Sequence, residues 1–484
     1  MKNEDLINAV GKIEDSIIED VSLTRKKRKK QKSLWVKITA VAACVCLIIS
    51  GVWFGLDFGS DTSLSAYAIE TAKYPETAQY PQNISDDNYE QYENSYDSWF
   101  NDVRARADLI EGHEKSIYSF VQEALPAFLT DEKLKDKNVV FSPLNVYMAL
   151  SLLAESTDGE SRQQILELLG ADNIEKLRES VSAVWNSTYR DDGSVKRLLS
   201  NSVWLSEELE YNKETMKLLA EKYYTSSFKG KMGSDEYNKE LQKWLSEETG
   251  GLLDDYAAEE EFSAQTVLAL ASTVFFSGKW DVEFSKSETT LDIFHGADGD
   301  KEAEFMKAQA EDYYFYSDNF SAYRRYFKNQ AGSMYFILPD EGVSVNEVLS
   351  DSAALKLISG EKEPSGKYLK INLSVPKFDI SSRLNLCDGV KKLGITDVFD
   401  DGKSDFSPMF SGDITGIYVD KINHSARIKI DEEGCEAAAF TTMMEAGKGA
   451  PPEETVDFVL DRPFIVCISD NNGLPLFVGV VNNV

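Results

Sequence analysis

The order of its predicted elements constrains the fold of this chain more than any other feature. Residues 142–156 begin with Ser142, a suitable N-cap, followed by Pro143 at the first helical position, and predict a buried helix. Residues 161–170 carry a capping box and a Gly stop, which predict a second helix. From residue 265 onward strand patterns dominate, so the chain is predicted to be α+β with large, mostly antiparallel sheets.

Three apolar patterns in the second half identify particular strands. The near-continuous apolar run at 265–278 predicts a central strand covered on both faces. Residues 368–380 alternate up to Pro376 and then resume with shifted parity, which predicts a bulge at Pro376-Lys377. The runs at 462–469 and 474–481 are joined by Asp-Asn-Asn-Gly, a hairpin signal.

The N-terminal region carries a membrane signal. A basic cluster, 25–32, precedes nineteen uncharged residues at 38–56, about the length of a transmembrane helix. Residues 1–37 have a net charge of +4 and the remainder −35. The positive-inside rule therefore predicts residues 1–33 as a cytoplasmic segment and 34–58 as a single-pass anchor of the cell membrane. A cleaved signal peptide, a lipoprotein signal and a buried core helix are the alternative interpretations.

The rest of the chain divides into a polar segment and one large domain. Residues 59–111 are acidic and Tyr-rich without a sustained period, so they are interpreted as a stalk, and residues 112–484 as the domain. The net charge of −31 argues against nucleic acid as a partner. The five cysteines show no disulfide framework or metal spacing, and the three histidines match no catalytic motif. Neither an enzyme nor a cofactor is predicted.

Eight segments in serial order resemble the serpin family of serine protease inhibitors. They include NVVFSPLNVYMALSLL, TVLALASTVFFSGKWDVEF, DGVKKLGITDVFDDGKSDFSPM, INHSARIKIDEEGCEAAAFTT and DRPFIVCI, and the resemblance runs from about Gly112 to Val484. It implies three β-sheets, about eight or nine helices and an exposed reactive-centre loop at about 432–455. In inhibitory members a protease cleaves this loop to an acyl-enzyme. The loop then inserts into the main sheet as a strand and traps the protease.

The resemblance also implies a hinge at the start of the loop. Its residues are Glu432, Glu433, Gly434, Cys435, Glu436, Ala437, Ala438 and Ala439. If Cys435, Ala437, Ala439 and Thr441 point inward on insertion, all four are small enough for a closely packed sheet. Gly434 is expected to flex where the strand turns in. A hinge without Pro or charge at inward positions favours an inhibitor over a non-inhibitory binding or surface protein.

Counting along the loop places the bait residue. In the family the scissile bond usually lies sixteen residues beyond the first hinge acid, which gives Lys448-Gly449. Lysine at this position suits a trypsin-like protease, whose pocket holds a carboxylate. A register slip to Ala446 or Gly447 would suit an elastase- or subtilisin-type pocket instead.

Five further positions match family features around the sheet opening. Trp280 matches the tryptophan under the point where the loop enters, and Ser142, Asn145, Ser272 and His424 match a polar cluster beneath the opening. The residue types at Asn145 and Ser272 are exchanged relative to the usual pattern, so we hypothesise that their hydrogen-bond partners are exchanged too. The anchor and the absent disulfides indicate a bacterial source, Gram-positive in type. The expected partner is an extracellular serine protease, held covalently by a monomer.

Overall fold

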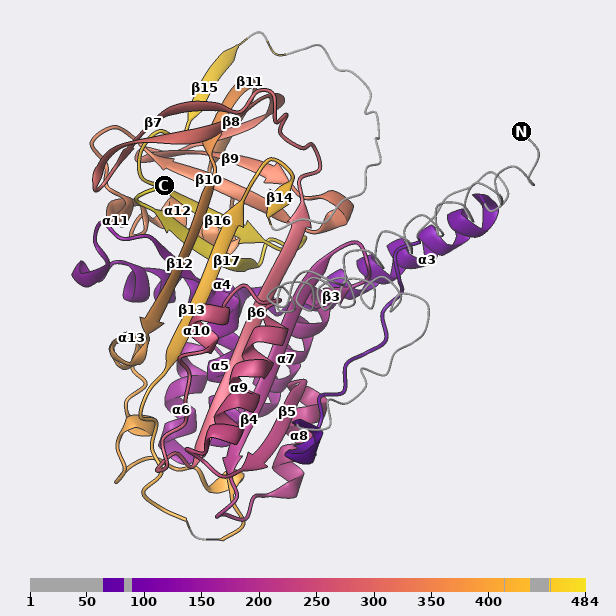
Figure 1. Ribbon diagram of the computed structural model, residues 1–484, viewed down its shortest axis with the longest axis vertical. Coiled ribbons are helices and arrows are strands. Elements are labelled where there is room, and N and C mark those ends of the chain that lie inside the picture. The colour runs from indigo at the N-terminus through magenta and orange to yellow at the C-terminus, as the bar shows by residue number, and fades with distance from the viewer. Residues whose placement is uncertain (1–63, 82–88, 413, 436–451, 453) are drawn as a thin grey trace, which may run out of the picture. The chain divides into compact units, whose positions relative to one another are not determined.

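The computed structural model describes residues 64–81, 89–412, 414–435, 452 and 454–484, and residues 66–484 form one compact unit. The predicted cytoplasmic segment 1–33 and anchor 34–58 lie outside the described residues. Within the described ranges, no helix combines the length and apolar character that a bilayer span requires. The α+β class is confirmed, since helices and two large sheets share this unit (Figure 1).

Most of the described helices lie in the first half of the chain, and most of the described strands lie in the second half. The helices are α3 (Tyr89–Ala107), α4 (Glu114–Leu129), α5 (Pro143–Ser156), α6 (Gly159–Leu168), α7 (Ile174–Thr188), α8 (Lys213–Lys222), α9 (Asp235–Glu248), α10 (Asp254–Ala257), α11 (Val345–Val348), α12 (Ser352–Ser359) and α13 (Cys387–Lys392). The strands are β1 (Ala68–Glu70), β2 (Val139–Phe141), β3 (Arg190–Asp191), β4 (Lys196–Ser206), β5 (Thr225–Gly230), β6 (Leu268–Lys279), β7 (Thr290–Gly296), β8 (Gly299–Tyr316), β9 (Phe320–Tyr326), β10 (Ser333–Pro339), β11 (Ser365–Pro376), β12 (Phe378–Asn385), β13 (Asn423–Ile430), β14 (Gly434–Cys435), β15 (Thr455–Val459), β16 (Phe464–Ser469) and β17 (Pro475–Val481).

The first sheet has eight strands in the order β1-β5-β4-β6-β14-β13-β12, with β3 beside β4. Its centre is β6, which confirms the central strand predicted at 265–278. Helix α9 contacts β6 and lies in front of the sheet, as Figure 1 shows. The two-residue strand β14 occupies the position between β6 and β13.

The second sheet has nine strands in the order β15-β11-β8-β9-β10-β16-β17-β2, with β7 beside β8. The resemblance implied three sheets, but strand β8 pairs with both β11 and β9 and so joins two of them into one hydrogen-bonded sheet. The described residues form eleven α-helices rather than eight or nine. Helix α3, which falls in the predicted stalk, and the four-residue helices α10 and α11 account for the difference.

Two local predictions are confirmed and one is wrong. Helix α5 begins at Pro143 with the Ser142 side chain accepting from the backbone, and nearly all its residues are buried. Strands β16 and β17 form the predicted hairpin. The capping box at 161–164 is wrong, because α6 begins at Gly159 and its N-cap is Asp158, three residues before Ser161. Gln164 instead accepts hydrogen bonds from the backbone of residues 396–397.

The parity shift at Pro376 marks a change of sheet rather than the predicted bulge. Strand β11 ends at Pro376 in the nine-stranded sheet, and β12 begins at Phe378 in the eight-stranded sheet. Lys377 lies between them and its backbone N–H donates to Glu304. One continuous extended segment therefore serves both sheets, and its inward side changes at the crossing.

The described part of the predicted stalk packs on the domain. Strand β1 pairs with β5, and Tyr74 stacks on Trp185 with ring centroids 5.3 Å apart. Helix α3 buries Trp99 to 1% exposure. The sequence suggested no sustained structure here because each contact is made with a residue far along the chain, which periodicity does not reveal.

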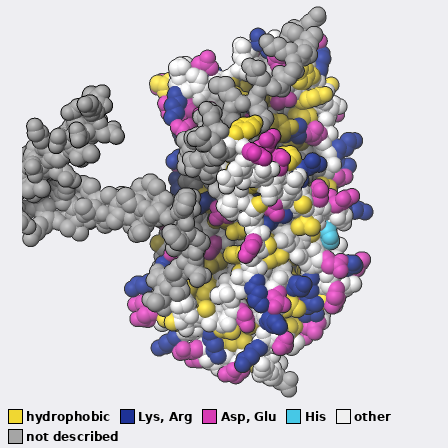
Figure 2. Space-filling view, turned by 90° about the vertical axis from the view of Figure 1, so that its right-hand side faces the viewer, with side chains coloured by type: hydrophobic (Ala, Val, Ile, Leu, Met, Phe, Trp, Pro, Cys, Tyr) yellow, Lys and Arg dark blue, Asp and Glu magenta, His cyan; other side chains and the backbone are white. Residues whose placement is uncertain are grey.

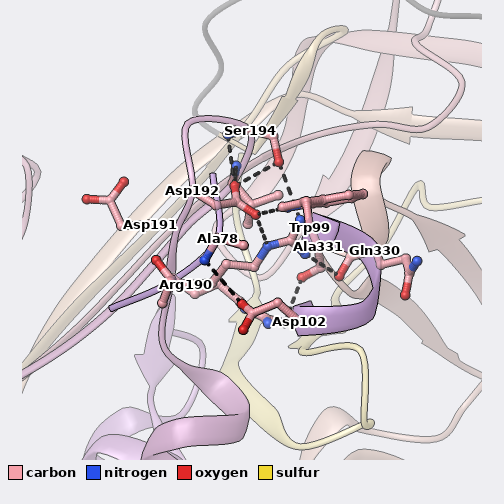
Figure 3. Close-up of polar contacts among 12 residues, drawn as sticks. Ala78, Trp99, Asp102, Arg190, Asp191, Asp192, Ser194, Gln330 and Ala331 are labelled. Carbon is pink, nitrogen blue, oxygen red and sulfur yellow. Dashed lines mark hydrogen bonds and ion pairs between the residues drawn. The ribbon is translucent and has the colours of Figure 1, made fainter. Parts of the chain in front are cut away.

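A hydrogen bond from Trp99 of α3 to a buried ion pair fastens this helix to the domain (Figure 3). The Trp99 indole donates to Asp192 at 2.7 Å, and the Arg190 guanidinium donates to the same carboxylate oxygen at 2.6 Å. Burial alone would raise the pKa of Asp192, but Arg190 and the hydrogen bonds outweigh it and the pKa is lowered. We define residues 66–81 and 89–111 as the N-terminal arm, because their strand pairing, ring stacking and buried hydrogen bonds join them to the domain.

The described surface mixes charges of both signs. On the face shown in Figure 2, acidic and basic side chains are interspersed despite the net charge of −31. Among the described side chains on that face there is no continuous basic patch that would suit a polyanion.

Candidate functional site

The predicted reactive loop connects the two sheets. Its first residues follow β13 and form β14 in the eight-stranded sheet, and its last residues lead into β15 in the nine-stranded sheet. The hinge residues Glu436, Ala437, Ala438 and Ala439, the bait candidates Ala446, Gly447 and Lys448, and Gly449 lie outside the described residues. The structure therefore describes where the loop leaves one sheet and joins the other.

The loop begins as a strand. Gly434 pairs with Lys279 and Cys435 with Gly278 on one side, while Cys435 pairs with Ile430 on the other. A Cβ on Gly434 would lie 2.4 Å from the carbonyl oxygen of Gly278, so only glycine fits. Close backbone approach thus requires glycine here, and the flexing expected where the strand turns in stays a prediction.

Beyond Cys435 the sheet is divided. In the described part of the chain, β6 and β13 neighbour each other only through β14. Residues 268–272 of β6 are only partly buried, although the strand is central. A cavity of about 20 Å³, lined by Val274, Ala426 and Cys435 among others, continues from the end of β14. That volume holds roughly one water, so a further strand requires β6 and β13 to separate.

Trp280 holds the entering segment. Its backbone N–H donates to the Glu433 carbonyl at 3.0 Å, and its indole donates to the Asp431 carbonyl at 3.0 Å. The ring is fully buried and stacks on Phe327 with centroids 4.7 Å apart. Trp280 thus binds two carbonyls of the turn that leads into β14.

A network of charges fixes the two hinge acids. The Glu432 carboxylate accepts from the Lys377 ammonium at 2.8 Å and from the Thr289 hydroxyl at 2.8 Å. Burial opposes ionisation of Glu432, but these donors outweigh it and the pKa is lowered. The Glu433 carboxylate lies 2.6 Å from Lys286, which lowers its pKa through the hydrogen bond first and the charge second.

The polar cluster predicted beneath the opening is present as a hydrogen-bonded chain. His424 Nε2 accepts from the Ser142 backbone at 3.0 Å, and the Ser142 hydroxyl donates to the Leu476 carbonyl at 2.6 Å. The Asn145 amide donates to the Ser272 hydroxyl at 3.1 Å across α5 and β6. Burial lowers the pKa of His424 to about 4, so its ring is neutral near pH 7. The exchanged pair is in contact, and the exchange of its hydrogen-bond partners relative to the family stays a prediction.

Three partners of the hinge were missed by sequence reasoning. Lys377, Thr289 and Lys286 bind the hinge acids from positions 55 to 147 residues away in the chain. The only indication in the sequence was the change of side in the apolar alternation at Pro376, which marks Lys377 as the residue between two sheets.

Comparisons with known proteins agree with this geometry. A family model for serpins (serine protease inhibitors) matches residues 118–484. Serpin-Z2B of Oryza sativa subsp. japonica is 30% identical over 380 residues, covering 72% of this chain and 91% of that protein. Serpin-ZX of Arabidopsis thaliana is 28% identical over 361 residues, covering 72% and 92%. Both relatives are plant proteins, so they give no support to a bacterial source.

Solved structures of similar fold match this chain over almost the whole length of the solved proteins. Native tengpin, a thermophilic serpin, is 25% identical with a TM-score of 0.67 and covers 86% of this chain and 98% of its own. AtSerpin1 of Arabidopsis, in its native stressed conformation, is 26% identical with a TM-score of 0.66 and covers 78% and 98%. The protein belongs to the serpin family of serine protease inhibitors.

Proposed function

We propose that this serpin inhibits a trypsin-like serine protease by inserting its cleaved loop between β6 and β13. The observation that carries the proposal is β14, because Gly434 already pairs with β6 and Cys435 pairs with both β6 and β13. Cleavage would release the far end of the loop and allow the remaining residues to follow along the same path.

The register of β14 indicates which residues of the inserted loop would face the core. Extended by two residues, Ala437 would lie between Phe276 and Ile428, whose side chains are 4% and 2% exposed. Extended to Thr441, the strand would lie between Ser272 and His424, where a hydroxyl meets the polar cluster. Small residues inward and a hydroxyl at the polar cluster match the surroundings that the sheet provides.

The length of the inserted segment suits trapping. At about 3.3 Å per residue, the segment from Cys435 to Lys448 spans roughly 40 Å of strand. A protease attached at its end would be carried to the opposite end of the sheet. Because trapping precedes hydrolysis of the acyl-enzyme, distortion of the protease at that point leaves the covalent bond in place.

Lys448 is the residue that selects the protease. It is the only Lys or Arg between Glu432 and Thr455, so a protease of trypsin-like specificity finds a single cleavable bond there. An elastase- or subtilisin-type protease would instead act at Ala446 or Gly447.

The proposed setting is outside the cell. The apolar run 38–56 and the preceding basic cluster support a single-pass anchor with the domain outside, acting as a monomer on an extracellular protease. Protease sensitivity of intact cells, read by antibodies against each end of the chain, tests this orientation.

Trypsin and an elastase are mixed separately with a chain that begins at Ser60. A covalent complex stable on denaturing gels with trypsin is expected, and the released peptide should begin at Gly449. A complex with elastase and a peptide beginning at Gly447 or Lys448 would move the bait to Ala446 or Gly447.

A pair of hinge variants provides the matched control. Ala437→Arg places a charge inward and should convert the inhibitor into a cleaved substrate, whereas Glu436→Arg, one residue earlier and outward, should still trap. Cleavage without trapping by the unmodified chain would favour the non-inhibitory alternative, in which the serpin acts as a binding or surface protein.

A further inference from the structure

Three exposed tyrosines gather on one face of the nine-stranded sheet. Tyr313 of β8, Tyr368 of β11 and Tyr326 of β9 are 51%, 48% and 44% exposed. Tyr313 is paired directly with Tyr368, and their ring centroids are 5.7 Å apart. Exposed aromatic side chains are ordinary when single, but a contiguous group is typical of a protein–protein contact.

An arginine joins these rings into one surface. The Arg324 guanidinium lies 4.8 Å from the Tyr326 ring centroid and 5.7 Å from that of Phe315. Phe315 in turn stacks on Tyr313 with centroids 6.3 Å apart. Arg324 also pairs with Glu363, which accepts from the Tyr335 hydroxyl at 2.7 Å. We define Tyr313, Tyr368, Tyr326 and Arg324 as the aromatic patch.

The aromatic patch is continuous with the end of the reactive loop. Strand β15, which follows the loop, pairs with β11 so that Thr455 lies opposite Lys370, two residues from Tyr368 on the same face. Given strand spacing, the Cα atoms of Thr455 and Tyr368 are about 8 Å apart. Figure 1 shows β15, β11 and β8 adjacent at the end of the sheet where β15 begins.

We infer that the aromatic patch is a second contact for the protease, used while the loop occupies its active site. The inference rests on the proposed inhibitory function. A protease bound to Lys448-Gly449 has the segment leading to Thr455 beneath its cleft, which brings its rim over the adjacent strands. Tyrosine and arginine supply much of the energy at such interfaces, and tyrosine loses little side-chain entropy on binding.

A structural role alone predicts a different outcome. Cross-strand aromatic pairs stabilise a sheet modestly, so replacing Tyr313 and Tyr368 would lower the melting temperature without changing affinity for a protease. The aromatic patch as a protease contact predicts the reverse, a loss of affinity at nearly constant stability.

The first experiment measures the affinity of the serpin for a protease that can bind the loop but cannot cleave it. Trypsin with its nucleophilic serine replaced by alanine is titrated against the serpin and against Tyr313→Thr/Tyr326→Thr/Tyr368→Thr, since threonine preserves strand propensity. Tyr316→Thr is the control, because Tyr316 is 45% exposed on β8 but alternates to the other face. The Kd of the triple variant should rise at least tenfold and that of the control less than twofold.

Active trypsin separates the two proposals. The triple variant should form covalent complex at least fivefold more slowly, with the same number of inhibitor molecules consumed per protease. An unchanged Kd with normal trapping overturns the inference and leaves the inhibitory function standing. If the triple variant has a raised Kd but the unmodified chain is cleaved by trypsin without trapping it, the aromatic patch is supported as a protease contact and the proposed inhibition is overturned. Self-association of the unmodified chain that the triple variant loses would assign the aromatic patch to a second copy and overturn the inference.

Discussion

Replacing Lys377 with Met should destabilise the hinge by removing the cation that faces Glu432. The Lys377 ammonium lies 2.8 Å from Glu432 and 3.2 Å from Glu304, and the Glu432 side chain is only 8% exposed. After the substitution Glu432 keeps the Thr289 hydroxyl but loses its counter-charge. The carboxylate then remains buried with one side-chain donor in place of two.

The size of the effect follows from this burial. Removing one partner of a fully buried ion pair costs about 3–5 kcal/mol of unfolding free energy. The Lys377 side chain is 28% exposed, so water can reach part of the vacated space and we expect about 2 kcal/mol. Glu432→Gln should cost about 1 kcal/mol, since Lys377 retains Glu304. The double substitution should cost about 1.5 kcal/mol, less than the sum, because neither charge is left alone.

Urea unfolding of the four proteins at pH 7 measures these differences, with Lys370→Met on β11 as the control lysine. The lowered pKa of Glu432 adds a second readout. Its contribution is fully present above the ordinary value of 4.5 and is lost as the pH falls through the folded pKa, so Glu432→Gln should flatten stability below pH 4.5. Additive losses in the double variant, or a loss for Lys370→Met equal to that for Lys377→Met, would refute the reasoning.

Three further predictions concern the N-terminal arm and the polar cluster. Trp99→Ala removes a buried indole and its bond to Asp192 and should cost about 4 kcal/mol of unfolding free energy in urea, whereas exposed Tyr89→Ala on the same helix should cost under about 0.5 kcal/mol. His424 has a folded pKa of about 4, below its ordinary 6.5, so stability should fall by roughly 2 kcal/mol from pH 7 to pH 5, a fall that His424→Asn should remove. Asn145→Ser should cost about 1 kcal/mol, and adding Ser272→Asn should restore it; additive losses would contradict the exchanged-partner hypothesis.

Patterns that repeat locally could be predicted from the sequence. Strand β6 and the β16–β17 hairpin are buried apolar runs, and α5 begins with a cap and a proline whose effects act within one turn. Each of these elements is specified by residues close together in the chain, so its pattern is visible in the sequence.

Features that depend on distant contacts could not be predicted. The bulge expected at Pro376 is a crossing between two sheets, which depends on where β8 and β13 lie. Helix α3 was interpreted as part of a stalk because its order depends on Trp99 meeting Asp192, 93 residues away. A local pattern also misled the capping prediction, since Asp158 rather than Ser161 caps α6.

Some residues of the candidate site could be predicted from the sequence and others could not. The hinge acids, Trp280 and the four residues of the polar cluster were named from a family resemblance, and the structure brings each beside the loop entrance or the opening of the sheet. Lys377 was missed, because an ion pair across 55 residues leaves no mark on local sequence. Gly434 was named for its flexibility, which stays a prediction, and the structure adds that backbone crowding also requires glycine there.

The melting temperature before and after loop cleavage tests the central claim most directly. The loop is cut by a protease that is not trapped, this protease is inactivated and removed, and the intact and cleaved chains are compared by calorimetry. An inserted strand of about ten residues, at ~1 kcal/mol each from hydrogen bonds and burial, adds roughly 10 kcal/mol and predicts a rise on the order of 10 °C for a domain of this size. A melting temperature that is unchanged or lower after cleavage would contradict insertion between β6 and β13.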